Sequence, residues 1–501
     1  MNNSSIWAHL NSPPANYPLL NSTIEVDVAV IGGGITGISA AYELIKRGKT
    51  VALIEAHKLG GVTTSHSTGN LYVPVQPFFH EIIKKFGIEE AKKVAQSRAS
   101  AIDSIEKNVN ELKIDCNFTR RPWYAYCSTP KQNERLVNEI DALKHLDFIA
   151  EEVKALPFEL KMTKAYRLVN QARFNPLNYL LSLAEILQKQ GCFIYEQTQA
   201  LDIEEDQICT VTTQEGKIKA KAVIMATHTP LGLNLTHFYT APYRSYVLAI
   251  NLPEMKLPDG NLWKLDDPYF ALSTHPIKSK ELDTLLIAGK HHKTGQDAPM
   301  DLNYEGISQF LKKSFPQFTE EFRWSAQHYQ SADTLPYIGP ASRFSKNIFM
   351  ATGYFADGLV YGTVAAQHLA ALIEEKLKQS SNLYSSTRSK PLASMKFLVE
   401  ENLNVAKEYL KDLPIHETKD FNKIKIGEGQ VVEINKEKIA ISRDENNQLH
   451  KVSAVCPHMK CIVAWNNAEQ TWDCPCHGSR FSQCGDYLEG PALCGLKKVE
   501  D

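Results

Sequence analysis

The chain has 501 residues, of which 43% are hydrophobic and 22% charged, with a formal net charge of −2 at pH 7. This ordinary globular composition and length predict about three domain-sized units. The balanced charge argues against nucleic acid or an acidic membrane surface as the main partner. Residues 1–7 lack a basic segment followed by an apolar one, and we find no apolar stretch long enough to span a bilayer. We therefore expect a cytoplasmic protein that does not span a membrane.

Residues 26–54 have the pattern of a strand, a helix and a second strand. The apolar run 26–31 stops at a glycine turn, and helical apolar spacing follows over residues 35–47. Residues 50–54 are a second short apolar run that ends at Glu55. This pattern predicts a βαβ unit.

The glycine turn between the first strand and the helix fits the G-x-G-x-x-G pattern. Such glycines let the backbone turn sharply and approach a pyrophosphate at the helix N-terminus. Glu55 lies where a carboxylate binds the ribose hydroxyls, so the context favours a dinucleotide site over a structural turn. Glu55 alone leaves FAD and NAD open. The glycines of the pattern are Gly32, Gly34 and Gly37.

Further elements follow along the chain. Residues 222–227 and 348–351 resemble buried strands, residues 193–221 suit hairpins, and a helix is expected from Gly358 to residue 373. Beyond a polar, serine-rich segment, the sequence predicts one helix and then a small β-domain. The helix is expected over 392–410 and the strands over 429–434, 438–442 and 449–455.

Two short segments near the C-terminus each supply one thiolate and one imidazole. Six of the ten cysteines lie between residues 456 and 494, and such crowding with histidine in a long chain is typical of a metal site. A zinc ion could use the same four ligands, so spacing alone leaves zinc open. The candidate ligands are Cys456, His458, Cys474 and His477.

Residues 26 to about 375 resemble the D-amino-acid oxidase, glycine oxidase and sarcosine oxidase family of FAD proteins. The resemblance rests on the glycine turn, Met225-Ala226-Thr227, the segment 333–340, and Thr352-Gly353 followed by Gly358. It implies FAD, with the helix after Gly358 aiming its positive end at the flavin. It also implies hydride removal from a carbon beside an amine nitrogen. The implied FAD-binding residues are Gly32, Gly34, Gly37, Glu55, Thr64, His66, Ala226, Gly353, Gly358 and Leu359.

Residues 61–69 resemble the segment of dimethylglycine and sarcosine dehydrogenases in which a histidine is joined covalently to the flavin. His66 occupies the corresponding place. A histidine that only packs near the ring, or bonds to the backbone, is an equal alternative. Both interpretations stay open.

The two ligand segments, with Gly490-Pro491, resemble Rieske proteins of the respiratory type from about Phe421 to Leu496. The resemblance favours a [2Fe–2S] cluster over zinc, with both thiolates on one iron and both histidines on the other. It also implies a disulfide between Cys461 and Cys476, one from each segment. Ser479 can donate a hydrogen bond to a cluster sulfur, but Phe481 replaces the usual tyrosine. We therefore expect a redox potential below the top of the Rieske range.

Three residues are candidates for the substrate side. Arg244 lies in a segment that resembles the strand returning to the substrate pocket and could clamp a carboxylate, but a surface or interdomain ion pair explains it equally well. Tyr246 follows in the same strand. His292 is one of two adjacent histidines, of which at most one can face the site, because neighbouring side chains on a strand point in opposite directions.

The expected fold is an α/β (α+β) FAD-binding Rossmann-like domain with a mixed-sheet substrate subdomain, followed by a small all-β Rieske domain. The FAD-binding domain is expected over 22–110, 165–240 and 333–376, and the substrate subdomain over 111–164 and 241–332. A linker and helix are expected over 377–420, and the Rieske domain over 421–501.

The predicted function is oxidation of an amine or amino acid by FAD, with electrons passing through the Rieske cluster to an external acceptor. No second glycine fingerprint for NAD(P)H is found in the sequence. The alternative is an O₂-reducing oxidase whose Rieske domain docks a partner or senses redox state. A Rieske oxygenase is disfavoured, because the sequence lacks a histidine and carboxylate array for a terminal iron.

Overall fold

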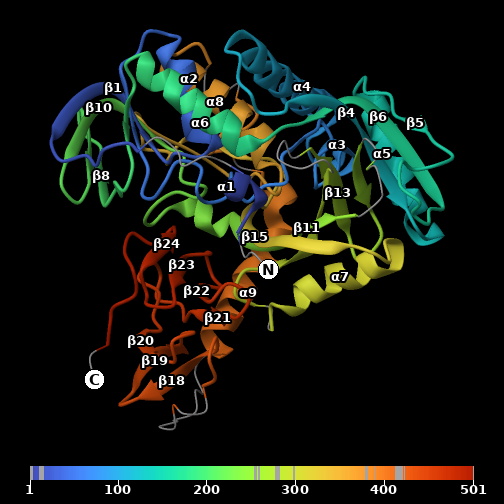
Figure 1. Cartoon of the computed structure of the whole chain (residues 1–501). Coiled ribbons are helices and arrows are strands. Elements are labelled where there is room, and N and C mark those ends of the chain that lie inside the picture. The colour runs from blue at the N-terminus through green and yellow to red at the C-terminus, as the bar shows by residue number, and fades with distance from the viewer. Residues whose placement is uncertain are drawn as a thin grey trace.

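The computed structural model describes residues 4–10, 16–252, 257, 260–276, 283–296, 299–377, 382–388, 390–411, 421 and 424–499. Two large sheets with their helices form the upper body in Figure 1, and a group of short strands, coloured red, forms a smaller body below them. We call residues 424–499 the C-terminal domain. None of the helices in the described ranges combines the length and apolar character that crossing a bilayer requires.

The first sheet has eight strands and carries the glycine turn. Its order is β16-β17-β10-β1-β2-β7, with β8 and β9 attached beside β10. The strands from β17 to β7 are parallel, so their carboxyl ends meet at one edge, where ligands bind in open α/β sheets. Their bounds are β1 (Thr23–Ile31), β2 (Val51–Ile54), β7 (Phe193–Tyr195), β8 (Asp202–Glu204), β9 (Cys209–Thr212), β10 (Lys217–Met225), β16 (Tyr337–Pro340) and β17 (Ile348–Thr352).

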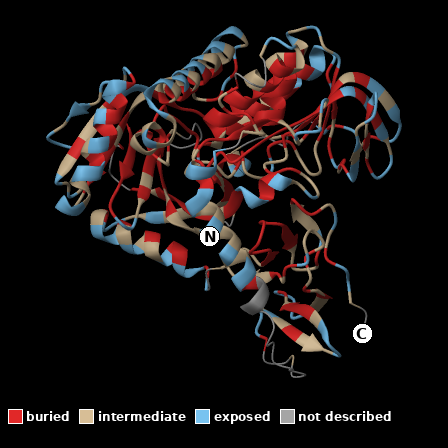
Figure 2. Cartoon of the chain, turned by 180° about the vertical axis from the view of Figure 1, so that it is seen from behind, coloured by how far each residue is buried: buried red, intermediate tan, exposed pale blue. Residues whose placement is uncertain are grey.

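Three helices pack together on this sheet: α2 (Ile35–Ile45), α6 (Pro176–Lys189) and α8 (Gly358–Ile373) (Figure 1). Buried residues, red in Figure 2, concentrate on these central elements, and exposed residues lie on the outer helices. The helix predicted from Gly358 to residue 373 is confirmed. Its apolar residues occur all round, which is typical of a fully buried helix.

The second sheet has nine strands in the order β15-β11-β14-β13-β12-β4-β6-β3, with β5 beside β6. The expected division placed residues 165–173 in the FAD-binding domain, but β6 pairs antiparallel with β4 and so belongs to this sheet. The bounds are β3 (Asn70–Leu71), β4 (Thr119–Cys127), β5 (Glu151–Glu152), β6 (Lys164–Arg173), β11 (Thr240–Asn251), β12 (Asn261–Lys264), β13 (Phe270–His275), β14 (Thr284–Lys293) and β15 (Thr319–Ser331).

Other helices surround the two sheets. They are α1 (Ile6–Leu10), α3 (Phe79–Phe86), α4 (Ile88–Glu111), α5 (Asn133–His145) and α7 (Leu302–Ser314), with the short 3₁₀ segments η1 (Pro130–Gln132) and η2 (Leu235–Phe238).

The described part of the predicted linker, residues 382–388, packs against the first sheet. Tyr384 is buried, and its carbonyl accepts a hydrogen bond from the backbone N–H of Ile338 at 2.7 Å. The Arg388 guanidinium lies 2.6 Å from Asp333 and also donates to the carbonyls of Leu335 and Pro336. The polar, serine-rich composition predicted a linker, and this part of it is held against the first sheet by the backbone carbonyls and the carboxylate that bind Arg388. Residues 378–381, 389 and 412–420 of the predicted linker and helix lie outside the described residues.

The helix α9 (Pro391–Lys411) leads to the C-terminal domain, which contains a three-stranded and a four-stranded antiparallel sheet. Trp472 and Phe481 are fully buried in its core. The helix and the three strands predicted from the sequence are confirmed. The strands are β18 (Gly429–Ile434), β19 (Glu437–Arg443), β20 (Leu449–Ser453), β21 (Ala464–Asn466), β22 (Thr471–Asp473), β23 (Arg480–Ser482) and β24 (Tyr487–Glu489).

Candidate functional site

The glycine turn between β1 and α2 has no room for side chains at two positions. Gly32 has φ +108°, and a Cβ there would lie 2.5 Å from the Ala226 carbonyl oxygen. A Cβ on Gly37 would lie 1.9 Å from the Gly32 carbonyl oxygen, so the helix can approach the turn only without it. A Cβ on Gly34 would meet only the Thr64 hydroxyl, at 3.4 Å. The middle glycine therefore leaves the backbone accessible to a ligand.

The surroundings of the turn fit a dinucleotide. The Glu55 carboxylate accepts hydrogen bonds from the backbone N–H of Gly33 at 2.7 Å and of His57 at 2.9 Å. The Thr64 hydroxyl accepts from the backbone N–H of Ile35 at 3.1 Å. The N-cap residue of α2 is Gly34, which has no side chain to bond the following amides, so further amide groups of the first turn can bind the pyrophosphate.

A cavity beside this turn is lined by residues of both large sheets and of β24 of the C-terminal domain. Gly37 and Gly353 pack beside it: a Cβ on Gly353 would meet the Ser331 side chain at 3.1 Å. Of the residues predicted to bind FAD, those that line the cavity are Gly32, Gly34, Glu55, Thr64, His66, Ala226, Gly358 and Leu359.

The helix α8 also begins at the cavity. Its N-cap, Asp357, makes no capping bond with its side chain. The Asp357 carboxylate instead accepts from the backbone N–H of Gln76 at 3.1 Å and lies 3.5 Å from Arg98. The first amide groups of α8 and the positive end of its dipole are thus available beside Gly358.

His66 lies in the cavity wall. Its Nδ1 is 2.5 Å from the Val62 carbonyl oxygen, and its own carbonyl accepts from the Trp324 indole at 2.8 Å. Burial lowers the pKa of this imidazole, so it is neutral at neutral pH. The Val62 contact fits the alternative in which His66 bonds to the backbone, and covalent attachment to the flavin stays a prediction.

Four candidate ligands converge in the C-terminal domain. Cys456 and Cys474 are buried free thiols in hydrogen-bonding contact. The rings of His458 and His477 are 5.0 Å apart, and the Nδ1 atom of each is buried without a hydrogen-bond partner among the described residues. Buried polar atoms are rarely left unpaired in proteins, so two thiols and two unpaired imidazole nitrogens fit a bound metal centre.

Cys461 and Cys476 form a disulfide. Their sulfur atoms lie within 4.8 Å of the Cys474 sulfur, but the disulfide removes both thiols from a ligand role. The bridge links the two ligand segments, as the resemblance implied.

Both ligand histidines face the first and second sheets. The His458 Nε2 is 3.1 Å from the Gly232 carbonyl oxygen, and the Tyr329 hydroxyl donates to the His477 carbonyl at 3.1 Å. The ring of His237, in η2, packs 4.7 Å from that of His458 and 5.7 Å from that of His477. Sequence reasoning missed Tyr329 and His237, because they lie far from the ligands in the chain and no local motif marks them.

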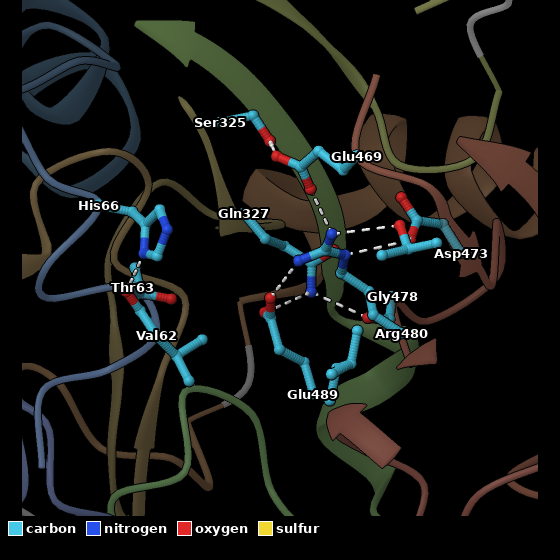
Figure 3. Close-up of polar contacts among 12 residues, drawn as sticks. Val62, Thr63, His66, Ser325, Gln327, Glu469, Asp473, Gly478, Arg480 and Glu489 are labelled. Carbon is cyan, nitrogen blue, oxygen red and sulfur yellow. Dashed lines mark hydrogen bonds and ion pairs between the residues drawn. The ribbon is translucent and has the colours of Figure 1, made fainter. Parts of the chain in front are cut away.

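A buried charge network joins the C-terminal domain to β11 and β15, as Figure 3 shows around Arg480. The Arg480 guanidinium binds Asp473 at 3.1 Å, Glu489 at 2.6 Å, and Glu469. Glu469 also accepts from Arg244 at 2.5 Å and from the Ser325 hydroxyl. Arg244 is fully buried, so this interdomain ion pair, and not a substrate clamp, accounts for its charge.

The three substrate-side candidates point away from the cavity. On β11, Ser245 and Val247 line it, so the alternating residues Arg244 and Tyr246 lie on the opposite face. His292 is bound to Tyr246 on that face, with its Nε2 3.1 Å from the tyrosine hydroxyl. The neighbouring His291 lines the cavity instead. The sequence predicted that at most one of the two histidines would face the site and named His292 as the candidate, whereas His291 is the one that lines the cavity.

Comparison with known proteins agrees with a dinucleotide site in the first part of the chain and a cluster site in the C-terminal domain. Residues 27–372 match the DAO family model, FAD dependent oxidoreductase, and residues 413–500 match the Rieske [2Fe-2S] domain. The chain is 36% identical to YhfW of Bacillus subtilis (strain 168), whose name describes a Rieske 2Fe-2S iron-sulfur protein, over 97% of this chain and 95% of that one. It is 25% identical to gamma-glutamylputrescine oxidoreductase of Escherichia coli (strain K12), over 77% of this chain and 92% of that one.

Among solved structures, glycine oxidase from Geobacillus kaustophilus has the same fold, with a TM-score of 0.61 and 20% identity over 73% of this chain and 99% of that one. The glycine turn and the two helix N-termini at the cavity fit FAD, and the two thiols and two imidazoles fit a [2Fe–2S] cluster. The chain therefore belongs to the FAD-dependent oxidoreductases of the DAO family and carries a Rieske [2Fe–2S] domain at its C-terminal end.

Proposed function

We propose that this protein is an FAD-dependent dehydrogenase of amines or amino acids that passes electrons through its Rieske cluster to an external one-electron acceptor. One observation carries the proposal. The cavity that contains the dinucleotide fingerprint is lined in part by residues of the C-terminal domain, and residues 477 and 478 of one candidate ligand segment bond to residues of the same cavity wall.

The contacts between the two sites are direct. Gln327 and Tyr329 of β15 both line the cavity. The Gln327 amide donates to the Gly478 carbonyl at 2.9 Å, and the Tyr329 hydroxyl donates to the His477 carbonyl at 3.1 Å. The ring of His228, also in the cavity wall, packs edge-on against Tyr329 at 4.8 Å. This short, buried connection favours electron transfer from the flavin to the cluster within one chain. It argues against a flavin and a cluster that work independently.

In this proposal the glycine turn and Glu55 hold the dinucleotide portion of FAD, and the N-terminus of α8 faces its ring system. FAD held by these residues would supply a two-electron acceptor for a hydride from the carbon beside the substrate nitrogen, and a donor of single electrons. The substrate nitrogen loses a proton, a C=N bond forms, and water hydrolyses the imine. Cys456 and Cys474 would hold one iron and His458 and His477 the other.

The proposal is tested by mixing the holoenzyme with a panel of amines and amino acids without oxygen. Flavin absorbance and the EPR signal of the reduced cluster are followed in the same samples. We expect a reactive compound to bleach the flavin and the cluster signal to appear with it. A cluster that stays oxidised while the flavin turns over with O₂ would instead support the oxidase alternative, in which the Rieske domain docks a partner or senses redox state.

The residues around the cluster predict its potential. The Ser479 hydroxyl accepts from the backbone N–H of Ala492 at 3.1 Å and contacts the Cys456 thiol, whereas Phe481 is fully buried and has no hydroxyl. Because hydrogen bonds to sulfur stabilise the added electron, we expect a midpoint potential below about +300 mV. Ser479→Ala should lower it by about 40 mV, because one such bond contributes about 1 kcal/mol and the cluster takes up one electron. A potentiometric EPR titration measures both values, and a wild-type midpoint at the upper limit contradicts the argument.

A further inference from the structure

Part of the cavity wall is a chain of neighbouring aromatic side chains and histidines, which we call the aromatic chamber. Successive rings are 4.9, 6.1, 5.6 and 5.5 Å apart. These residues come from the second sheet and its surroundings, not from the glycine turn. In order of contact they are Tyr72, Trp263, Tyr269, His291 and His328.

The cavity wall carries no permanent positive charge within the described ranges: none of the described residues that line it is lysine or arginine. Its carboxylates are Glu55, Asp357 and Glu489. Buried arginines that approach the wall are already engaged. Arg480 pairs with Glu489 at 2.6 Å and Arg98 with Asp357 at 3.5 Å, and Arg244 pairs with Glu469. Arg98 also donates to the carbonyls of Tyr72, Val73 and Pro74 at 2.8–3.0 Å.

The two histidines of the chamber are uncharged at neutral pH. Burial lowers the pKa of His291 to about 4 and holds that of His328 well below its ordinary value. His328 is 4% exposed, and its Nε2 has no hydrogen-bond partner among the described residues; the same holds for the Nδ1 of His291. Each ring therefore presents an unpaired nitrogen that can bond to a neutral amine.

A substrate carboxylate in this chamber would lose its hydration without gaining a free cationic partner. An amine nitrogen meets neutral imidazoles, and aromatic faces attract it when it is protonated. The aromatic walls also favour an apolar substituent.

We propose that the substrate is a primary or secondary amine with an apolar or aromatic substituent and without a carboxylate on the carbon that is oxidised. This inference rests on the proposed amine oxidation and narrows its substrate class. The carbon loses a hydride to FAD, the nitrogen loses a proton, and the resulting imine is hydrolysed to an aldehyde or ketone and the free amine or ammonia. The two electrons then leave singly through the cluster to the external acceptor.

The test compares matched pairs that differ only by the carboxylate: benzylamine with phenylglycine, and 2-phenylethylamine with phenylalanine. Flavin bleaching of the holoenzyme is measured without oxygen. We expect the rate constant divided by the dissociation constant to be about 100-fold higher for the amine, because an unpaired buried charge is costly. Equal or faster bleaching by the amino acids overturns the inference while leaving the proposed function intact. Dithionite serves as the control that shows the flavin can be reduced. If dithionite reduces the flavin but no amine or amino acid bleaches it, both this inference and the proposed function fail.

Two adjacent residues provide a matched pair of variants. His291→Lys places a cation in the chamber and should reduce the preference for the amine about 10-fold. His292→Lys adds the same charge on the opposite face of β14 and should leave the ratio between the paired compounds unchanged. A ratio that shifts equally in both variants contradicts a local charge effect.

Discussion

Replacing Gly37 with alanine is expected to yield a protein that has lost its FAD. The added Cβ would lie 1.9 Å from the Gly32 carbonyl oxygen, so α2 must move away from the glycine turn. That movement displaces the amide groups that bind the pyrophosphate. The ratio of flavin to protein absorbance measures the loss, and the EPR signal of the cluster shows whether the C-terminal domain remains folded.

A matched control lies just beyond the other end of the same helix. Gly48 has φ +74°, and a Cβ there meets nothing within 4 Å. Gly48→Ala should therefore cost about 1–2 kcal/mol of backbone strain but retain FAD. Full FAD content in Gly37→Ala would show that the turn does not form the cofactor site.

The local parts of both sites were predictable from the sequence because their ligands lie close together in the chain. The glycine turn needs six consecutive residues, and each cluster-ligand segment supplies its thiolate and imidazole within four. Period-two alternation likewise showed that only one of His291 and His292 can face the cavity. It could not show which one, because that choice depends on how β14 is placed against β11 and β13.

The contacts between the two sites were not predictable. Tyr329 reaches His477 across 148 positions, and Arg244 reaches Glu469 across 225. An isolated buried arginine in a sequence is compatible with a substrate clamp or an ion pair. The structure decides between these two roles, because the docked C-terminal domain places the Glu469 carboxylate against Arg244.

The Glu469 network yields the second large expected effect. Glu469→Gln removes the negative charge shared by Arg244 and Arg480, and Arg244 is then buried without a counter-charge. Breaking a buried ion pair in this way typically costs about 3–5 kcal/mol. We therefore expect a lower denaturation midpoint and weaker docking of the C-terminal domain, measured by thermal unfolding and by limited proteolysis between the domains.

The pH dependence of this effect has a definite sign. Burial raises the pKa of Glu469, but Arg244 and Arg480 outweigh it and lower the pKa from 4.5 to about 2. The contribution of Glu469 to stability is therefore complete above pH 4.5 and is lost as the pH falls toward 2. The stability difference between wild type and Glu469→Gln should shrink over this range, in unfolding curves taken from about pH 6 to about pH 3.

A matched substitution separates this effect from a general loss of charge. Glu437 is exposed on β19 of the same domain, and Glu437→Gln should change the unfolding free energy by less than about 0.5 kcal/mol. The neutral glutamine at position 469 keeps the size and shape of the side chain, so a large effect confined to that variant isolates the charge. If both variants unfold like the wild type, the Glu469 network does not stabilise the docked arrangement.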